Sequence, residues 1–415
     1  MTETLGQPPW MTAPDTAAVF DALEAAGGAD CARVVGGAVR NALIGHPASD
    51  IDIATTLSPD EVIKALRAAG LKAIPTGVEH GTVTAVSGGK PFEVTTLRRD
   101  VETDGRRAVV AFTDDWLEDA QRRDFTLNAL YARRDGTIFD PTGHGVADAR
   151  AGRIVFVGEA SQRILEDGLR ILRFFRFLAW YGKGAPDAAA VAACAALKDR
   201  ITTLSAERVS KEMLKLLGAG DPRPAVALMA TTGVLAMVLP EPDLSRFTGM
   251  VTIEEDQLFE CDAVLRLAAL LPDDQIAAAQ FAERLRLSNA ERERIIAALA
   301  PTPAFKSWMS PREIRRWVYR LGARPFRDRV KLAWARADRT AVTPQWRGMI
   351  ALGEGWSPPK FPLTGDDVVK AGVPKGPMVG QVLREVEDWW IDHDFINDPM
   401  SAVEKLKSIA QGMAF

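Results

Sequence analysis

The stretch VGGAVRNALIGHPASDIDI, residues 35–53, decides how the N-terminal part of this chain folds. Gly36-Gly37 lets backbone N–H groups approach an anion, because no Cβ stands in the way. Side chains alternate between the two faces of a strand, so Asp50 and Asp52 should lie on the same side. Two neighbouring carboxylates repel one another unless a hard divalent cation lies between them. The stretch therefore predicts a nucleotide site, in which phosphate-binding backbone lies beside a metal-binding carboxylate pair.

Length and composition indicate a soluble protein of several domains. A chain of 415 residues is too long for one ordinary core, so two to four domains are expected. The net charge is -4, so any surface that binds nucleic acid must be local. The three cysteines form no C-x-x-C motif, the N-terminus lacks the pattern of a signal peptide, and no apolar run approaches the ~18 residues of a membrane span. We expect a cytoplasmic protein with no membrane association.

The pattern along the chain predicts an α+β head followed by an all-helical remainder. Strands are expected at 31–35 and 51–54, a Ser-capped helix at 58–69, and a hairpin over 82–97 around Gly88-Gly89. Beyond about residue 155 the spacing is helical to the end. The predicted domains are an N-terminal loose arm and helix (1–28), the head (29–150), a helical neck (151–230), a helical body (231–355) and a helical tail (356–415).

A second block of interest is RRDFTLNAL, residues 122–130. Its two arginines offer a fork for phosphate oxygens. Asp124 and Asn128 are one helical turn apart and could hydrogen-bond ribose hydroxyls. The alternative interpretation is the start of an amphipathic helix, with Asp124 as its capping residue.

A third block is RILEDGLRILRFFRF, residues 163–177. As one continuous helix with about 100° per residue, it would place four charged residues on one flank and the aliphatic side chains opposite. Arg176 projects among the leucines, so we expect it to reach another part of the chain, such as the head. The alternative is an exposed ladder of ion pairs. The four residues on the charged flank are Arg163, Glu166, Arg170 and Arg173.

These three blocks, in this order, resemble those of the class II tRNA nucleotidyltransferases and bacterial poly(A) polymerases. The segment AERVSKE (206–212) resembles the family's downstream helical motif. The segments LTGDD (363–367) and GVPKGP (372–377) resemble the tail of many bacterial CCA-adding members. The resemblance covers nearly the whole chain. It implies a catalytic head of the DNA polymerase β type, followed by a helical neck, body and tail.

The resemblance implies nucleotidyl transfer assisted by two Mg²⁺ ions. Asp50 and Asp52 would hold these ions, one of which would activate the RNA 3′-hydroxyl while the other neutralises the triphosphate. Glu93 is a candidate third carboxylate, and a structural role for it is equally open. Position 41 is Asn where the family commonly has Asp, so an orienting partner of Arg40 loses its charge. The residues implied to hold the triphosphate are Gly37, Arg40 and Arg123.

The third block would choose the base. Cytosine and adenine each present an amino donor beside a ring-nitrogen acceptor, and uracil and guanine reverse that pattern. Asp167 could accept from the amino group while Arg170 donates to the ring nitrogen. Glu166 would hold the guanidinium groups of Arg170 and Arg173. The complete predicted nucleotide-binding set is Gly37, Arg40, Arg123, Asp124, Asn128, Glu166, Asp167, Arg170, Arg173 and Arg176.

A basic segment at 311–339 is the predicted contact with RNA. It holds ten Lys or Arg residues against three acids, in a chain whose net charge is -4. The alternative interpretation is a solvated helix face. The residues predicted to bind RNA are Arg312, Arg315, Arg316, Arg320 and Arg324.

Addition of CCA to the 3′ end of tRNA from CTP and ATP is the preferred function. The segment 98–115, which includes Asp104-Gly105-Arg106-Arg107, supplies a loop that members adding only CC often lack. A poly(A) polymerase of the same fold is the nearest alternative, and an inactive RNA-binding relative is the alternative from another class. Retention of the acidic pair and of Arg123, Asp167 and Arg170 argues against the inactive relative.

Overall fold

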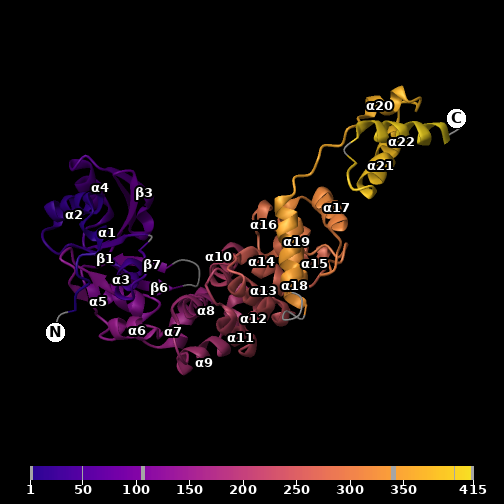
Figure 1. Cartoon of the computed structure of the whole chain (residues 1–415). Helices are drawn as coiled ribbons and strands as arrows, with labels where there is room; N and C mark the ends of the chain where they lie inside the picture. The colour runs from indigo at the N-terminus through magenta and orange to yellow at the C-terminus, as the bar shows by residue number, and fades with distance from the viewer. Residues whose placement is uncertain (1–2, 49, 104–107, 338–342, 397, 413–415) are drawn as a thin grey trace. The chain divides into compact units, whose positions relative to one another are not determined.

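The structure, a computed structural model, describes residues 3–48, 50–103, 108–337, 343–396 and 398–412. The chain forms two compact units, Met1–Glu241 and Pro242–Phe415 (Figure 1). Among the described residues every strand lies between positions 32 and 139, and the rest of the regular structure is helical. The predicted fold class is confirmed, and the finer division into five segments stays a prediction.

A seven-stranded mixed sheet forms the centre of the first unit, with the strand order β3-β4-β5-β2-β1-β8-β9. The pair β2–β5 is parallel and the other neighbours are antiparallel. A separate two-stranded hairpin is made of β6 (Arg98–Thr103) and β7 (Ala108–Phe112). The sheet strands are β1 (Ala32–Val35), β2 (Asp52–Thr55), β3 (Lys72–Gly77), β4 (Thr82–Ser87), β5 (Lys90–Thr96), β8 (Tyr131–Ala132) and β9 (Ile138–Phe139).

The predicted strands around the acidic pair are confirmed to within a residue. β1 is buried along its whole length, as expected for a central strand of Val and Ala. The predicted hairpin is β4–β5, which closes with Ser87 opposite Lys90. Gly88 and Gly89 both have positive φ, at 57° and 78°, and a two-residue turn of this kind requires that conformation. The loop predicted at 98–115 is the β6–β7 hairpin, and its residues 104–107 lie outside the described residues.

Helices cover the sheet of the first unit. The helix expected at 58–69 is confirmed as α4, in which Ser58 and Glu61 form a capping box and Pro59 occupies the first position. The helices of this region are α1 (Pro9–Thr12), α2 (Pro14–Gly27), α3 (Gly37–Leu43), α4 (Pro59–Ala68), α5 (Trp116–Gln121) and α6 (Gly145–Ala151), with 3-10 turns η1 (Val78–His80) and η2 (Thr126–Asn128).

The loose N-terminal arm was a wrong expectation for residues 3–8. The backbone N–H of Leu5 donates to the carbonyl of Gly136 at 2.9 Å. Glu3 accepts two hydrogen bonds from the guanidinium of Arg150, at 2.9 and 2.7 Å. These long-range contacts fasten the segment to the head, and its proline-rich sequence carries no sign of them.

The neck begins with two helices instead of the predicted single helix. Asp167 has φ -151° and ψ 106°, so its extended backbone separates α7 from α8. A Cβ on Gly168 would lie 2.9 Å from Cβ of Arg200, so this glycine allows η3 to approach the start of α8. The break also leaves Leu165 half exposed, although one continuous helix would have buried it. The elements are α7 (Ala160–Glu166), α8 (Leu169–Tyr181), α9 (Ala188–Ala196), η3 (Lys198–Thr203), α10 (Ala206–Leu217), α11 (Arg223–Thr231) and α12 (Val234–Val238).

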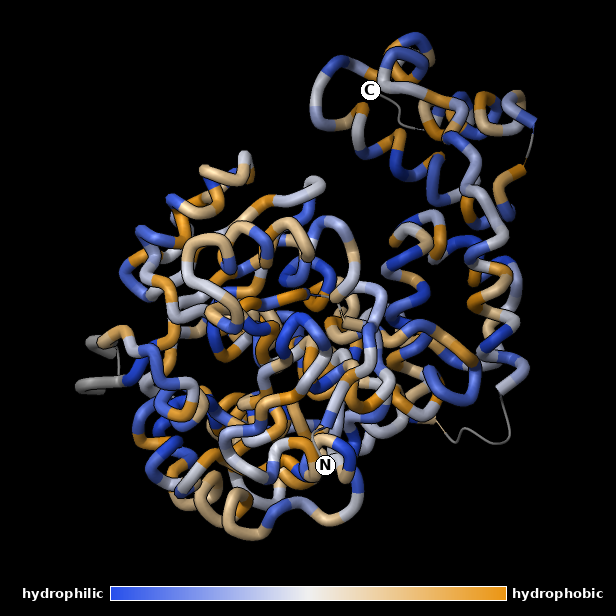
Figure 2. Tube along the Cα trace, turned by 90° about the vertical axis from the view of Figure 1, so that its left-hand side faces the viewer, coloured by the Kyte–Doolittle hydropathy of each residue, from blue (hydrophilic) through white to orange (hydrophobic). Residues whose placement is uncertain are grey.

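The second unit is helical throughout its described residues. Apolar and polar residues alternate along its helices (Figure 2), the pattern of helices that bury one face. Buried Phe326 and Trp334 make α18 a central element. No helix among the described residues of either unit is long and apolar enough to cross a membrane. The helices are α13 (Leu244–Asp256), α14 (Ala263–Leu270), α15 (Gln275–Arg284), α16 (Asn289–Ala298), α17 (Pro311–Leu321), α18 (Ala323–Arg336), α19 (Thr343–Gly355), α20 (Gly365–Lys370), α21 (Pro377–Asp392) and α22 (Pro399–Gly412).

Candidate active site

The glycine pair forms the turn between β1 and α3. Gly36 has φ 70° and ψ -117°, a conformation that L-residues with a side chain adopt only with strain. A Cβ at this position would lie 3.8 Å from Nη1 of Arg123 and 3.6 Å from the carbonyl oxygen of Asn128. The first two sequence blocks therefore meet at this turn, as the nucleotide-site hypothesis requires.

The acidic pair lies next to the same turn because of the strand register. β1 and β2 are antiparallel, and Val35, the residue before the turn, is opposite Asp52. Asp52 is in turn opposite Glu93 of the parallel neighbour β5. Burial and the charges of Glu93 and Asp50 together raise the pKa of the Asp52 carboxyl to about 6, and the charge of Arg123 opposes this rise. Negative charge is therefore concentrated and poorly compensated beside the glycine turn.

The acidic pair fits a hard divalent cation in its donor chemistry. Carboxylate oxygens are the protein ligands that Mg²⁺ prefers, and a cation would relieve the repulsion that raises the pKa of Asp52. In the described part of the chain, no three His, Cys, Asp or Glu side chains are grouped so that they could hold a metal ion. Glu93 is thus a neighbour of the pair by register and not part of a preformed three-carboxylate cluster.

Arg123 is held in place by Asp119, a residue that the sequence interpretation missed. Its Nε and Nη2 donate to Oδ2 of Asp119 at 3.2 and 2.9 Å. The hydroxyl of Tyr131 donates to the same oxygen at 2.6 Å. Asp119 also accepts from Arg122 Nε at 2.8 Å and from the backbone N–H of Arg98 at 3.3 Å. These bonds leave Nη1 of Arg123 directed at the glycine turn.

The electrostatics of this cluster keep Asp119 charged. Burial alone would raise the pKa of its carboxyl, but Arg123, Arg122 and the Tyr131 hydroxyl lower it to about 2. Asp119 precedes Arg123 by four residues, the spacing of an ion pair on a helix surface. That spacing was the one local signal by which the sequence could have identified it.

Arg40 is buried and its guanidinium is occupied by protein partners. Nε and Nη2 donate to Oδ1 of Asn41 at 3.1 and 2.8 Å, and Nη1 donates to Oδ1 of Asn128 at 2.5 Å. Nη2 also donates to the hydroxyl of Tyr181 at 2.8 Å, and that ring lies 4.0 Å from the guanidinium carbon. Asn41 therefore keeps the orienting contact that its lack of charge had put in question. In this arrangement Arg40 fixes the positions of the side chains of Asn41, Asn128 and Tyr181.

Asp124 and Asn128 are close together but lie in no α-helix. Nδ2 of Asn128 donates to Oδ1 of Asp124 at 3.1 Å, and a 3-10 turn at 126–128 brings them together. Oδ2 of Asp124 accepts from Nε of Arg173 at 2.7 Å. Asp124 therefore links the second block to the neck, while Asn128 joins Asp124 to Arg40 within the head, and the alternative of an amphipathic helix that begins at Asp124 is wrong.

The charged residues of the third block divide into two groups by their partners, and one ion pair crosses the helix break. Glu166 accepts from Nη1 of Arg170 at 2.5 Å and also pairs with Arg163. Nη2 of Arg170 donates to the carbonyl of Arg122 at 2.9 Å. Glu166 therefore holds Arg170 across the break but does not hold Arg173 as expected, because Arg173 pairs with Asp124 of the head.

Asp167 at the break is oriented by two contacts. Its Oδ1 accepts from the backbone N–H of Leu169 at 3.0 Å, and its Oδ2 accepts from Nη2 of Arg208 at 2.7 Å. Nε of Arg176 donates to Glu212 at 2.6 Å, so Arg176 reaches α10 of the neck and not the head. Arg208 and Glu212 both lie in the AERVSKE segment. The sequence predicted no partner for either residue.

The basic segment at 311–339 is largely neutralised by acids within the second unit. Three arginines of α17 pair with carboxylates at the end of α21, and the hydroxyl of Tyr319 donates to Glu387 at 2.5 Å. Arg312 and Arg324 are exposed and make no ion pair with any described residue; Asp338 and Arg339 lie outside the described residues. The three pairs are Arg315–Asp394, Arg316–Asp392 and Arg320–Asp388.

Comparison with known proteins identifies the family of the head and of part of the neck. The family model "Poly A polymerase head domain" matches residues 32–155, and the model "Probable RNA and SrmB-binding site of polymerase A" matches residues 186–245. The chain is similar to a solved Bacillus stearothermophilus CCA-adding enzyme in complex with CTP. The TM-score is 0.78 at 27% identity, over 98% of this chain and 99% of that one.

Curated relatives extend this likeness along the chain. "CCA tRNA nucleotidyltransferase 1, mitochondrial" of Mus musculus is 34% identical over 373 residues, which are 86% of this chain and 82% of the relative. The CCA-adding enzyme of Geobacillus stearothermophilus is 42% identical over 209 residues, 49% of this chain and 50% of the relative. With its glycine turn, acidic pair and Arg123 arranged as described, the chain belongs to the family of CCA-adding tRNA nucleotidyltransferases.

Proposed function

We propose that this protein completes or repairs the 3′-terminal CCA of tRNA by transferring nucleotides from CTP and ATP. The observation that carries the proposal is the register of β1 on β2, which brings Asp52 beside the glycine turn and Arg123. Phosphate-binding backbone, a cation and a carboxylate pair within one site are the groups that nucleotidyl transfer needs. The whole-chain likeness to CCA-adding relatives supports the choice of product.

Enzymes of this family generally depend on a metal, and we propose Mg²⁺ held by Asp50 and Asp52. When bound there, the metal supplies charge neutralisation for the triphosphate and activation of the RNA 3′-hydroxyl. The raised pKa of Asp52 supports this role, because uncompensated carboxylates favour a divalent cation. Glu93 would act from the neighbouring strand, by adding negative charge to the site.

The triphosphate would be bound by Nη1 of Arg123 and by the backbone of the turn at Gly37. Arg123 suits this role because Asp119 and Tyr131 fix its orientation without using Nη1. Arg40 would act indirectly, by fixing Asn41 and Asn128 around the turn. Asp124 and Asn128 would place polar side chains near the ribose. Asp124 would also join the head to Arg173.

The base would be chosen by Asp167 and Arg170 at the start of α8. An aspartate acceptor beside an arginine donor suits cytosine and adenine and rejects uracil and guanine. Asp167 is about one third exposed and oriented by Arg208, so it can present an acceptor at the surface. Glu166 would position Arg170, while Arg173 and Arg176 would support the helix through Asp124 and Glu212.

Contact with the tRNA would involve the second unit and its C-terminal tail. Arg312 and Arg324 are exposed and make no ion pair with any described residue, so they are the simplest candidates for phosphate contacts in the predicted set. The other three would have to exchange their α21 carboxylates for phosphates. We also propose a cytoplasmic location, which cell fractionation would test.

The decisive experiment supplies a tRNA transcript that lacks its 3′ end, with CTP and ATP separately and together. Addition of C, C and A followed by a stop is the expected result. A long A tract from ATP alone would instead support the poly(A) polymerase interpretation. Failure to extend any RNA, while the RNA still binds, would favour an inactive RNA-binding relative.

A further inference from the structure

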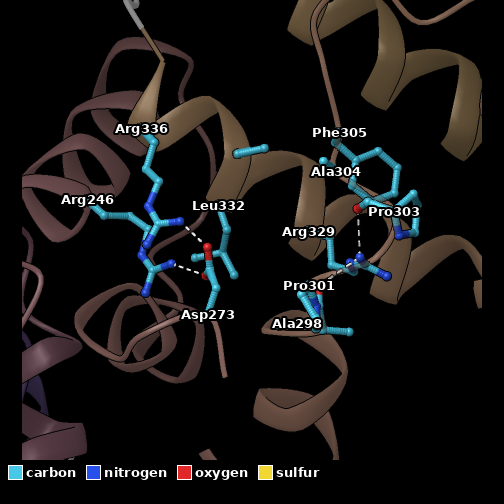
Figure 3. Close-up of a pocket in the computed structure, with 12 residues that line it drawn as sticks. Arg246, Asp273, Ala298, Pro301, Pro303, Ala304, Phe305, Arg329, Leu332 and Arg336 are labelled. Carbon is cyan, nitrogen blue, oxygen red and sulfur yellow. Dashed lines mark hydrogen bonds and ion pairs between the residues drawn. The ribbon is translucent and has the colours of Figure 1, made fainter. Parts of the chain in front are cut away.

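A cavity of about 260 Å³ lies in the second unit, far from any residue of the acidic pair in the sequence. The end of α16, the loop 300–304 and Arg329 of α18 line one side, and the loop at Asp273 and the end of α18 at Arg336 line the other (Figure 3). One buried water needs only about 10–15 Å³ of such space. The cavity can therefore hold a polyatomic ligand.

Two of the three arginines that line the cavity share one carboxylate. Arg246 and Arg336 both pair with Asp273 (Figure 3). Arg246 is 1% exposed, and its remaining donors bond the carbonyls of Ala268 and Ala269 at 3.1 and 2.8 Å. Asp243 also pairs with both guanidinium groups, at 3.8 Å from Arg246 and 3.2 Å from Arg336, so two cations and two acids balance on this side of the cavity.

Arg329, on the opposite side of the cavity, has no carboxylate partner. It is 4% exposed, and its Nη2 donates to the carbonyls of Ala300 and Pro303 at 2.8 Å each. Neither its Nε nor its Nη1 has a hydrogen-bond acceptor among the described residues. Burial lowers the pKa of Arg329, and only the charge of Asp273 opposes this effect. A buried cation without a counter-ion is costly unless a ligand compensates it.

We propose that this cavity binds a phosphate group, with Arg329 as its principal cation. The lining carries three guanidinium groups and one carboxylate, and Asp243 pairs with two of these guanidinium groups, so one added anion would balance the remaining charge of Arg329. Nε and Nη1 of Arg329 can each donate one hydrogen bond to a phosphate oxygen, and a hydrogen bond from a charged donor to a phosphate is stronger than one between neutral groups. Phe305 lies under the guanidinium, with its ring centre 5.1 Å away, and limits where the group can move.

The phosphate could come from an RNA backbone or from a free phosphate in solution. The RNA source rests on the proposed function, since a tRNA held by this unit would present phosphodiesters to the exposed side of Arg336. The chemistry of the cavity is the same for both sources, so separate measurements must distinguish them.

The first measurement is calorimetric titration of the full-length protein with inorganic phosphate at constant ionic strength. The variant Arg329→Gln keeps an amide that can bond the loop carbonyls but loses the charge. Arg292→Gln, an exposed arginine of α16 outside the cavity, is the matched control. Phosphate bound at the nucleotide site contributes equally to all the proteins. We expect one phosphate site to be lost in Arg329→Gln and kept in Arg292→Gln.

A second pair of variants tests the proposal independently if Arg329→Gln fails to fold. Ala333 lines the cavity and makes no side-chain hydrogen bond. Ala333→Glu would add a carboxylate to the cavity and abolish phosphate binding, while the isosteric Ala333→Gln would retain it. Equal phosphate binding by the wild type, Arg329→Gln and Ala333→Glu would overturn the proposal.

The second measurement is the affinity for tRNA as a function of salt. If an RNA phosphate occupies the cavity, Arg329→Gln should weaken binding and reduce the slope of log K against log salt by about 0.9. If phosphate binding is lost while tRNA affinity and slope are unchanged, the ligand is a free phosphate. Failure of CCA addition by a wild-type protein that still binds phosphate would contradict only the proposed function.

Discussion

A single carboxylate oxygen of Asp119 accepts two hydrogen bonds from Arg123, at 3.2 and 2.9 Å, and a third from Tyr131 at 2.6 Å. This relationship fixes a cation whose Nη1 is directed at the glycine turn. We predict that Asp119→Asn raises KM for CTP and ATP alike, because Arg123 loses its orientation. Loss of a charge-assisted bond worth about 1.5–3 kcal/mol corresponds to an increase of roughly tenfold or more.

Steady-state kinetics with each nucleotide would test this positioning role. Tyr131→Phe removes the second residue that holds Arg123 but leaves the Arg123–Asp119 pair intact, so it should raise KM less. Glu79→Gln, at an exposed acid of the head, is the control. An Asp119→Asn protein with unchanged KM values and only reduced thermal stability would show that Asp119 is purely structural.

The same carboxylate predicts a pH dependence of stability. Its pKa is lowered from 3.8 to about 2 in the folded protein, so its stabilisation is present above pH 3.8 and is lost as pH falls toward 2. The difference in unfolding free energy between the wild type and Asp119→Asn should lose about 2 kcal/mol over that range. Urea unfolding at several pH values measures it, and a difference that stays constant down to pH 2 would contradict the assignment.

We predict that Asp50→Ala and Asp52→Ala each lower Mg²⁺-dependent addition by at least about 100-fold, by removing a metal ligand. Binding of tRNA should stay nearly normal, since these carboxylates hold the metal. Glu79→Ala removes an exposed acid of the same head and should have no effect. Near-normal turnover in both aspartate variants would rule out the metal assignment.

Nucleotide selection should depend on Asp167 and Arg170. Asp167→Ala should reduce the use of CTP and ATP and bring UTP and GTP closer to parity, with a change in discrimination of roughly 5- to 150-fold. Arg208→Gln should act in the same direction but more weakly, because Asp167 loses only its orienting partner. Competition assays with the four nucleotides test this, with exposed Asp199→Ala as the control. An unchanged ranking in folded Asp167→Ala and Arg170→Ala proteins would place selection elsewhere.

The ion pairs between α17 and α21 allow a charge-swap test of RNA binding. Arg320→Glu should weaken tRNA binding if Arg320 contacts phosphate, and adding Asp388→Arg should not restore it. If the Arg320–Asp388 pair serves only to dock α21, the double swap should recover both binding and stability. The stability change itself should be small, about 0–1 kcal/mol, because the pair is half exposed. Filter binding and thermal unfolding of the two variants distinguish these outcomes.

Several features followed from the sequence because they depend on neighbours within a few residues. The Gly36-Gly37 turn, the capping box at Ser58 and the Gly88-Gly89 hairpin all express local backbone rules. The helix break at Asp167 was missed, although Gly168 marked it. Its cause is the close approach of Arg200, which lies 32 residues away along the chain.

The partners of the charged residues were decided by the tertiary structure alone. A sequence shows that Arg40, Arg173 and Arg176 carry charge. It does not show that their hydrogen bonds are accepted by Tyr181, Asp124 and Glu212, respectively. A side chain can reach any acceptor that folding brings within about 3 Å, and these acceptors lie 36 to 141 positions away. The sequence alone therefore determined which chemistry the site contains, and the packing of distant elements decided which arginine could still receive a phosphate.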